Sequence, residues 1–242
     1  MPRKAALPFV FLNLAMTADG KIATANRRYS SFSSAQDKRH MMELRATADA
    51  VMSGARTVDL NAVTLGPGAT KYRRQRLERG LPEYNLRIVV SRAGSLDPKA
   101  HLFRKRFSPI IVLTTRSAPE HRIRRLRAVA DEVKAFGSEE IDFRRAFRWL
   151  RRRWQIRRLL CEGGGELDGA LFQAGVVNEL HLTICPVIFG GASAPTIADG
   201  VGVANLADAT QLQLKSARRI KDELFLTYRV TRAARRARQS SR

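Results

Sequence analysis

Three consecutive glycines, Gly163, Gly164 and Gly165, stand between a short apolar run and a segment whose apolar residues recur at helical spacing. Backbone N–H groups at the start of a helix attract anions, and glycines let a phosphate come close to the chain. The spacing is not G-x-G-x-x-G, because Asp168 occupies the sixth position, and no P-loop lysine follows. From the local pattern alone, a phosphate cradle and a plain tight turn are both open.

Two further junctions place small or hydroxyl residues where an apolar run ends. Ser53 and Gly54 end one run, with Thr57 shortly after them, and Ser91 with Arg92 ends another. In open α/β sheets, ligands bind outside the carboxyl ends of the strands. The three junctions together therefore predict a ligand cleft at that end of a sheet.

Two carboxylates lie at comparable positions. Asp19 belongs to MTADGK, where Asp-Gly is also ordinary turn chemistry, so a loop role and a functional role are both open. Glu162 ends an apolar run directly before the glycines, so we expect it to be partly buried and to need a partner. An arginine of the protein or a bound ligand would satisfy it. The dispersed histidines show no metal-ligand spacing, and we expect no metal site.

The charge balance is strongly basic. Among 242 residues, 44 are Lys or Arg and 22 are Asp or Glu, which gives a net charge of +22. Such an excess attracts nucleic acid, acidic lipid or phosphorylated small molecules. The segments 121–129 and 143–158 carry much of it, with apolar spacing that predicts amphipathic helices. We favour solvated basic faces there, and expect no nucleic acid, because no recognition motif accompanies the charge.

Membrane and redox signals are weak. No apolar run approaches the roughly 18–20 residues that cross a bilayer, so we expect no membrane partner. Cys161 and Cys185 lie within apolar runs and suggest no disulfide framework, which favours a reducing, cytoplasmic setting.

Strand-like and helix-like runs alternate along most of the chain, which predicts an α/β domain with a mostly parallel sheet. The final strands follow one another directly and predict an antiparallel C-terminal edge. We expect strands at 9–15, 49–53, 86–91, 109–114, 131–136, 157–162, 180–188, 211–216 and 222–230, and helices at 34–47, 54–60, 119–129, 141–152 and 165–174. We expect a single domain over 1–230, followed by a basic, disordered tail at 231–242.

Local signals set some boundaries. Ser34 followed by Asp37 predicts a capping box that opens the helix at 34–47, and Gly175 predicts the end of the helix at 165–174. The segment 61–85 is polar with scattered Gly and Pro, and we interpret it as a long, functional loop.

Several motifs in this order resemble the riboflavin-biosynthesis reductase family, which comprises the reductase domain of the bifunctional deaminase/reductase and its stand-alone archaeal and fungal relatives. They are LAMTADGKIA (14–23), LRATADAVMSGARTV (44–58), RIVVS (87–91), CEGGGELDGALFQAGVVNELHLTICPVIFGG (161–191) and APTIADG (194–200). The resemblance covers about residues 8–230. It implies a three-layer, dihydrofolate-reductase-like fold, a homodimer, and NADPH-dependent reduction of a phosphorylated small molecule, a ribosylamino-pyrimidine 5′-phosphate, to its ribitylamino form.

The resemblance also implies roles for individual residues. The cofactor would be contacted by Ala15, Thr57, Asn61, Ser91, Gly163, Gly164, Gly165, Glu166 and Leu167. The substrate would be bound by Arg45, Glu162 and Leu65, with Arg45 on its phosphate. Asp19 would lie near the reacting end, where we expect it to polarise the substrate ring or relay a proton. Apart from the resemblance, we infer from its position next to Ser91 that Arg92 favours the 2′-phosphate of NADPH.

One segment departs from the family pattern. After GARTV the family usually shows Asp-Asp-Pro-x-Leu-Thr, whereas this chain reads DLNAVTLGPG at 59–68. Asn61 stands where a cofactor-contacting Asp is expected, and Gly68 replaces a substrate-binding arginine. A dihydrofolate-reductase-like NADPH reductase of another, pterin-like or unknown substrate therefore stays open. An alternative of a different class is a basic module that binds nucleic acid through 121–158.

Overall fold

Strands that are buried on both faces of a parallel sheet need nearly continuous apolar sequence, and the chain provides it in LRIVV and IIVLT. The structure is a computed structural model that describes residues 6–27 and 32–232. Its strands are β1 (Phe9–Thr17), β2 (Ala50–Gly54), β3 (Leu86–Val90), β4 (Ile110–Thr114), β5 (Glu132–Ala135), β6 (Arg158–Cys161), β7 (Glu179–Cys185), β8 (Gln211–Ile220) and β9 (Glu223–Arg232).

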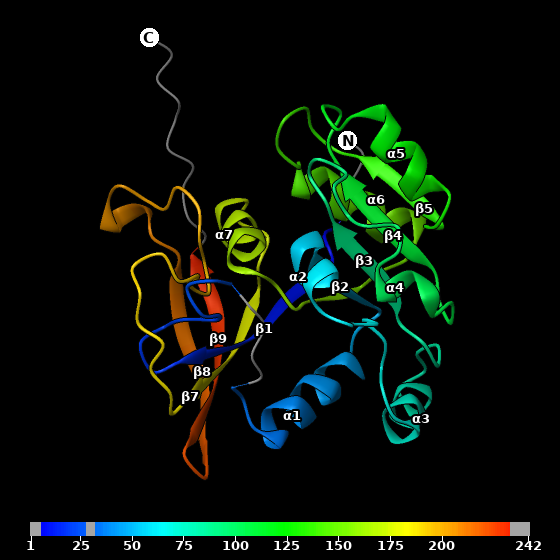
Figure 1. Ribbon diagram of the computed structural model, residues 1–242. Coiled ribbons are helices and arrows are strands. Elements are labelled where there is room, and N and C mark those ends of the chain that lie inside the picture. The colour runs from blue at the N-terminus through cyan, green and yellow to red at the C-terminus, as the bar shows by residue number, and fades with distance from the viewer. Residues whose placement is uncertain (1–5, 28–31, 233–242) are drawn as a thin grey trace.

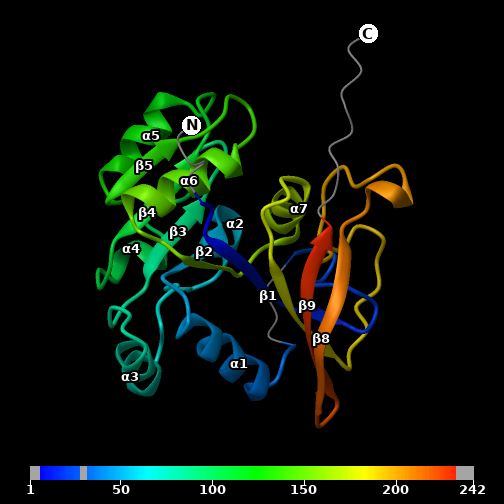
Figure 2. The ribbon, with the colours of Figure 1, turned by 180° about the vertical axis from the view of Figure 1, so that it is seen from behind.

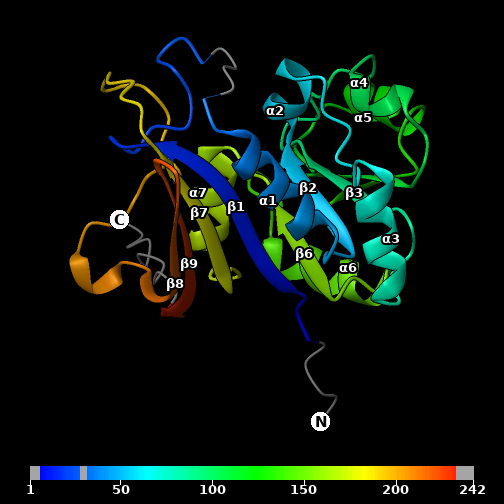
Figure 3. The same cartoon turned by 90° about the horizontal axis from the view of Figure 1, so that it is seen from below.

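All of these strands join one sheet in the order β5-β4-β3-β2-β6-β1-β7-β9-β8. The pairs from β5 to β7 are parallel, and β9 pairs antiparallel with both β7 and β8. Figure 3 shows β1 passing between β6 and β7. The predicted mostly parallel sheet with an antiparallel C-terminal edge is confirmed. The β8–β9 hairpin and β5 lie at opposite ends of the sheet (Figures 1 and 2).

The helices cover both faces of the sheet. They are α1 (Ala35–Arg45), α2 (Ala55–Leu60), α3 (Thr70–Glu78), α4 (His101–Arg104), α5 (Glu120–Arg127), α6 (Phe143–Arg153) and α7 (Gly165–Gln173), with a 3-10 turn at Leu206–Asp208. Alternate residues of β1 point to opposite faces of the sheet and belong to two separate hydrophobic cores. Val10 and Leu12 pack with α6 and α7, and Phe11 packs with α2, α4 and α5. This confirms the predicted three-layer α/β arrangement.

Both predicted helix caps are present, one with a different partner. The Ser34 hydroxyl accepts from the backbone N–H of Gln36 and Asp37 and so begins α1. The reciprocal half of the capping box does not come from Asp37, because Glu223 of β9 accepts the Ser34 N–H instead, at 2.8 Å. Gly175 adopts a φ of +61° directly after α7 and ends that helix as predicted.

The predicted loop at 61–85 is wrong in its middle, where α3 forms. Its sequence TKYRRQRLE has no apolar stripe, and the buried residues of this helix are Tyr72 and Arg76. The short α4 was also not predicted. Strand β9 extends through residues 231 and 232, which the sequence assigned to the tail, and 233–242 lie outside the described residues. None of the helices in the described ranges is long and apolar enough to span a membrane.

Candidate active site

The carboxyl ends of β2 and β6 meet because the two strands are parallel neighbours, with Met52 opposite Cys161. Beyond that pair, the carbonyl of Gly163 lies 3.4 Å from the Gly54 backbone nitrogen, 3.4 Å from the Ser53 hydroxyl and 3.3 Å from the Thr57 hydroxyl, all of which donate to it. Two of the three predicted junctions are therefore joined around one carbonyl group.

The three glycines differ in what surrounds them. A side chain at Gly163, whose φ is +45°, would collide with the buried Asp168 carboxyl, and one at Gly165 would collide with the loop at Thr196 and Asp199. Gly164 has a φ of +118°, and a Cβ there would meet the Thr57 hydroxyl at 3.5 Å and nothing nearer. Gly163 and Gly165 are thus required by close contacts inside the protein, whereas Gly164 has free space beside it.

The negative charge of the two acidic residues that follow the glycines is either paired or suppressed by burial. Glu166 is exposed and pairs with Arg56 at 2.9 Å and with Arg27 at 3.5 Å. Asp168 is fully buried, and this burial raises the pKa of its carboxyl well above the ordinary value. Its Oδ1 accepts from the thiol of Cys161 at 3.5 Å. The first turn of α7 therefore carries little uncompensated negative charge, and two arginines stand beside it.

Glu162 forms an ion pair with Arg45, as expected for a buried carboxylate. Arg45, the last residue of α1, donates from Nε to Oε1 at 2.6 Å and from Nη2 to Oε2 at 2.5 Å. The side chains are 7% and 9% exposed, so the ion pair is nearly withdrawn from water. Bidentate geometry fixes the carboxylate plane as well as its position. Of the two partners that the sequence left open for Glu162, an arginine of the protein or a ligand, the structure contains the arginine.

Arg45 is itself held from two sides. Its Nη1 donates to the carbonyl of Gly66 at 2.7 Å, which ties the divergent segment 59–68 to the pair. The fully buried Arg76 of α3 donates to the carbonyls of Arg45 and Ala48, at 2.9 and 2.5 Å. Burial lowers the pKa of Arg76 to about 10. The guanidinium of Arg76 thereby joins the last carbonyl group of α1 to the turn that follows it.

Asp19 lies exposed beyond β1 and organises the loop after β7. It accepts from the Thr17 hydroxyl at 2.5 Å and from the backbone N–H groups of Phe189 and Gly190, at 3.2 and 2.7 Å. These hydrogen bonds, that of Thr17 first, hold the pKa of Asp19 below its ordinary value. The group is therefore a carboxylate at neutral pH.

Three of the remaining predicted cofactor residues lie near this end of the sheet. Ala15, half-buried, lies opposite Thr183 in the β1–β7 register. Asn61 follows α2 and donates from Nδ2 to the Thr57 carbonyl at 2.8 Å, while its buried Oδ1 has no partner among the described residues. Leu167 of α7 buries its side chain, so it could offer a ligand only its backbone.

Other predicted residues are engaged within the protein. The Ser91 hydroxyl is 2% exposed and accepts from Leu96 N–H. Arg92 pairs with Glu140 at 2.6 Å. Leu65 is 1% exposed, and its carbonyl accepts from Asn85 at 2.8 Å. Leu65 is therefore packed inside the protein, whereas the Arg92 side chain is exposed and, among the described residues, only its Nη1 is engaged.

Sequence reasoning missed three arginines of this region. Arg56 follows the Ser53-Gly54 junction within SGART, so its position next to the glycine turn could have been inferred from the strand–helix pattern. Arg27 approaches Glu166 from a loop distant in sequence, and Arg76 lies in the helix that was taken for a loop. The last two had no local signal. In the described part of the chain, no cluster of three His, Cys, Asp or Glu could hold a metal ion.

Sequence comparisons identify relatives of this chain. A 2,5-diamino-6-ribosylamino-4(3H)-pyrimidinone 5′-phosphate reductase of Methanothermobacter thermautotrophicus is 34% identical over 223 residues, covering 92% of this chain and 98% of the relative. A reductase of the same name from Archaeoglobus fulgidus is 33% identical and covers 80% of this chain and 87% of the relative.

Solved structures show the same fold. A pyrimidine reductase-like protein of Corynebacterium diphtheriae superposes with a TM-score of 0.76 at 22% identity, covering 93% of this chain and 92% of the other. The sheet is of the dihydrofolate-reductase-like type found in RibD reductases. A model of the RibD C-terminal domain matches residues 8–226, and the chain belongs to this reductase family of riboflavin biosynthesis.

Proposed function

We propose that this chain is an NADPH-dependent reductase that converts a ribosylamino-pyrimidine 5′-phosphate to its ribitylamino form in riboflavin biosynthesis. Family membership and two relatives of that name, both at least 33% identical, support the reaction class. The observation that carries the proposal is the nearly buried Arg45–Glu162 pair directly before the glycine turn. A fixed carboxylate beside an anion-binding helix start suits a phosphorylated, hydrogen-bonding substrate.

The family implies a nicotinamide cofactor, and the residues present fit NADPH. Gly164 leaves room beside Thr57 for a pyrophosphate, and the N–H groups in the first turn of α7 have no intrahelical partner. Arg27 and Arg56 add positive charge there, and the orphaned Oδ1 of Asn61 can accept from a ribose hydroxyl. When bound, the cofactor supplies the hydride for the reduction.

Arg45 and Glu162 act as a unit in this proposal. The guanidinium of Arg45 is bonded to Glu162, so we propose that Arg45 orients this carboxylate and does not bind the substrate phosphate directly. Each carboxylate oxygen keeps a further acceptor site, which can take a donor of the pyrimidine. The substrate contact expected of Leu65 is not part of the proposal, because that side chain is buried.

Asp19 contributes electrostatics in this proposal. Its lowered pKa keeps it ionised, so it suits stabilising positive charge on the reacting group better than donating a proton. It also fixes the loop at Phe189 and Gly190 over the end of β1.

The direct test follows nicotinamide absorbance with the purified chain, NADPH and either the deaminated or the non-deaminated ribosylamino-pyrimidine 5′-phosphate. We expect one of the two to be reduced. Binding of NADPH without reduction of either would overturn the riboflavin assignment and favour another substrate of a dihydrofolate-reductase-like enzyme, chosen by the segment 59–68.

We further propose that the chain forms a homodimer through the exposed face of β8. Nine of the ten residues of this edge strand are exposed, and its Leu212 and Leu214, 41% and 52% exposed, stand opposite Val230 and Tyr228 of β9. Cross-strand partners share one face of a sheet, so these leucines extend an apolar face beyond the core. An uncovered edge strand with apolar side chains needs a partner, and a second copy would cover it symmetrically.

A further inference from the structure

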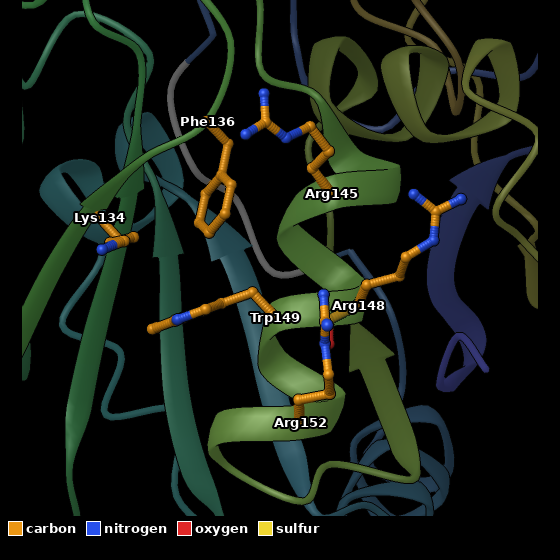
Figure 4. A pocket seen from close by; sticks show the side chains of 6 residues that line it. All are labelled: Lys134, Phe136, Arg145, Arg148, Trp149 and Arg152. Atoms are coloured by element: carbon orange, nitrogen blue, oxygen red, sulfur yellow. The ribbon is translucent and has the colours of Figure 1, made fainter. Parts of the chain in front are cut away.

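A hollow lies between β5 and α6, away from the glycine turn. It encloses about 420 Å³ and is lined by Lys134, Phe136, Arg145, Arg148, Trp149 and Arg152 (Figure 4). Strand β5 is the edge of the sheet, four positions from β6, which corresponds to roughly 19 Å at about 4.8 Å per strand. The proposed reductase site does not use any of these residues.

The positive charge of this hollow lacks anionic partners. Helix α6 reads FRRAFRWLRRR, with six arginines and no acidic residue. Arg145, Arg148 and Arg152 recur at helical spacing, so they line one face. Within residues 6–27 and 32–232, no salt bridge involves these three or Lys134, whereas Arg92 and Arg127 elsewhere pair with glutamates. Four uncompensated cations around one hollow repel each other, and an anion would relieve that repulsion.

The same hollow contains an aromatic pair. The rings of Phe136 and Trp149 have centroids 5.5 Å apart at 53°, and in Figure 4 the indole extends from α6 toward Lys134 on β5. Trp149 is half-buried and stands on α6 between Arg145 and Arg152. Phe136 is 7% exposed and belongs to the core, so Trp149 provides the accessible aromatic face. An aromatic face flanked by arginines is an arrangement on which a nucleobase can stack while phosphates meet the cations.

We propose that the α6–β5 hollow binds single-stranded nucleic acid. From Arg145 to Arg152 the stripe runs about 10 Å at 1.5 Å per residue, so its cations can meet successive phosphates, with the indole for a base between them. A duplex would hide the base faces, and a single nucleotide would leave part of the stripe unmatched. The proposal revises our preference for a solvated face over 143–158.

The side chains that line the hollow predict which single-stranded nucleic acids bind. All six side chains are cationic or aromatic and none has a hydrogen-bond acceptor, so the site cannot read donors on base edges. Binding rests on phosphates and base stacking, which every base offers. RNA and DNA strands of one length are therefore bound alike, with little sequence preference and a strong dependence on salt.

The test uses fluorescence anisotropy of labelled 12-mers, oligo-dT and oligo-rU, with the full chain at physiological salt. We expect both to bind, and the double variant Arg148→Glu with Arg152→Glu to weaken binding at least tenfold. Its matched control is Arg74→Glu with Arg124→Glu, two exposed arginines on α3 and α5 that change the net charge equally. Trp149→Ala should weaken binding several-fold without a change in salt dependence, because it removes the stacking surface and no charge.

Several outcomes would overturn the proposal. One is an equal loss of oligonucleotide affinity in both double variants, which would indicate nonspecific charge attraction. Another is displacement of the oligonucleotide by a free nucleotide at equal nucleotide concentration. A third is tighter binding to duplex than to single-stranded nucleic acid. Retention on phosphatidylserine vesicles without strand binding would assign the hollow to a lipid surface. Circular dichroism of each variant checks its fold, and reduction of the pyrimidine should be unchanged in Arg148→Glu with Arg152→Glu.

Discussion

Arg45 and Glu162 connect the end of α1 to the end of β6 through two parallel hydrogen bonds, 2.6 and 2.5 Å long, although 117 residues separate them in the chain. Both side chains are more than nine-tenths withdrawn from solvent. In such a pair each ion depends on the other, because desolvation of an unpaired charge is costly. The pair is therefore at once a structural link and the proposed substrate anchor.

Substitution Glu162→Gln separates these two roles. We expect turnover to fall more than tenfold while the Kd for NADPH stays within about twofold, because Glu162 faces the substrate in our proposal. Loss of one partner from a buried pair costs about 3–5 kcal/mol, so the free energy of unfolding should fall as well. The measurements are steady-state NADPH oxidation, NADPH fluorescence titration and urea unfolding.

A double variant, Arg45→Met with Glu162→Leu, controls for stability. It removes both charges, and apolar replacement of a buried pair is often neutral. We expect it to regain the unfolding free energy and to remain inactive. Recovery of turnover in the double variant, or parallel loss of turnover and NADPH affinity in Glu162→Gln, contradicts a substrate role for Glu162.

Arg76→Met tests how Arg45 is held. The variant leaves the carbonyls of Arg45 and Ala48 without their buried donor, and each unsatisfied group costs about 1–3 kcal/mol. We expect lower stability in urea and a lower kcat with nearly unchanged NADPH affinity. Arg74→Met, at an exposed position of the same helix, is the control and should match wild type. A wild-type kcat in a folded Arg76→Met protein would show that Arg45 needs no such support.

The elements that the sequence predicted correctly are those with local signals. Buried strands are apolar runs, and the turn at Gly163–Gly165 is marked by its own residues. Helix α3 escaped prediction because its buried side chains are Tyr72 and Arg76, so no apolar period exists along it. A buried arginine that donates to backbone carbonyls looks, in sequence, like solvated charge.

The sequence could nominate residues for the candidate site, but it could not predict how they are arranged. The family resemblance named Arg45 and Glu162 separately, and only the fold brings them into one ion pair. Which glycine is free depends on Asp168 beneath Gly163 and on Asp199 beside Gly165, and both contacts are tertiary. Local pattern therefore could not tell a cradle from a turn, and the structure has features of both.

Gly164→Ala tests the cradle. Its φ of +118° strains any L-residue, at a cost of about 1–3 kcal/mol, but no atom blocks the added methyl group. Gly80→Ala is the matched control, since Gly80 has a φ of +70° and open space around it, at the end of α3. We expect both variants to lose stability and only Gly164→Ala to bind NADPH more weakly, at least tenfold by fluorescence titration. Equal affinity in the two variants would refute a phosphate contact at Gly164.

Leu214→Lys tests the proposed dimer. A charge within a covered apolar face should dissociate the dimer, whereas Leu77→Lys, at a comparably exposed leucine of α3, should not. The two leucines are 52% and 56% exposed, which makes the substitutions equivalent in a monomer. Sedimentation velocity measures the outcome. A wild-type chain that sediments as a monomer, or two variants that behave alike, would speak against β8 as the interface.

Asp168→Asn tests the buried carboxyl beneath the glycine turn. Because burial raises its folded pKa above the ordinary 3.8, the folded state holds a proton that the unfolded state releases. The unfolding free energy of the wild type should therefore fall as pH rises from about 4 through the raised pKa, by at most about 1.4 kcal/mol per pH unit. The asparagine keeps the shape without the titration, so its advantage over wild type should grow with pH. Urea unfolding between pH 4 and 9, with the exposed Asp222→Asn as control, measures this difference, and parallel curves for wild type and Asp168→Asn would mean that the carboxyl is not neutralised by burial.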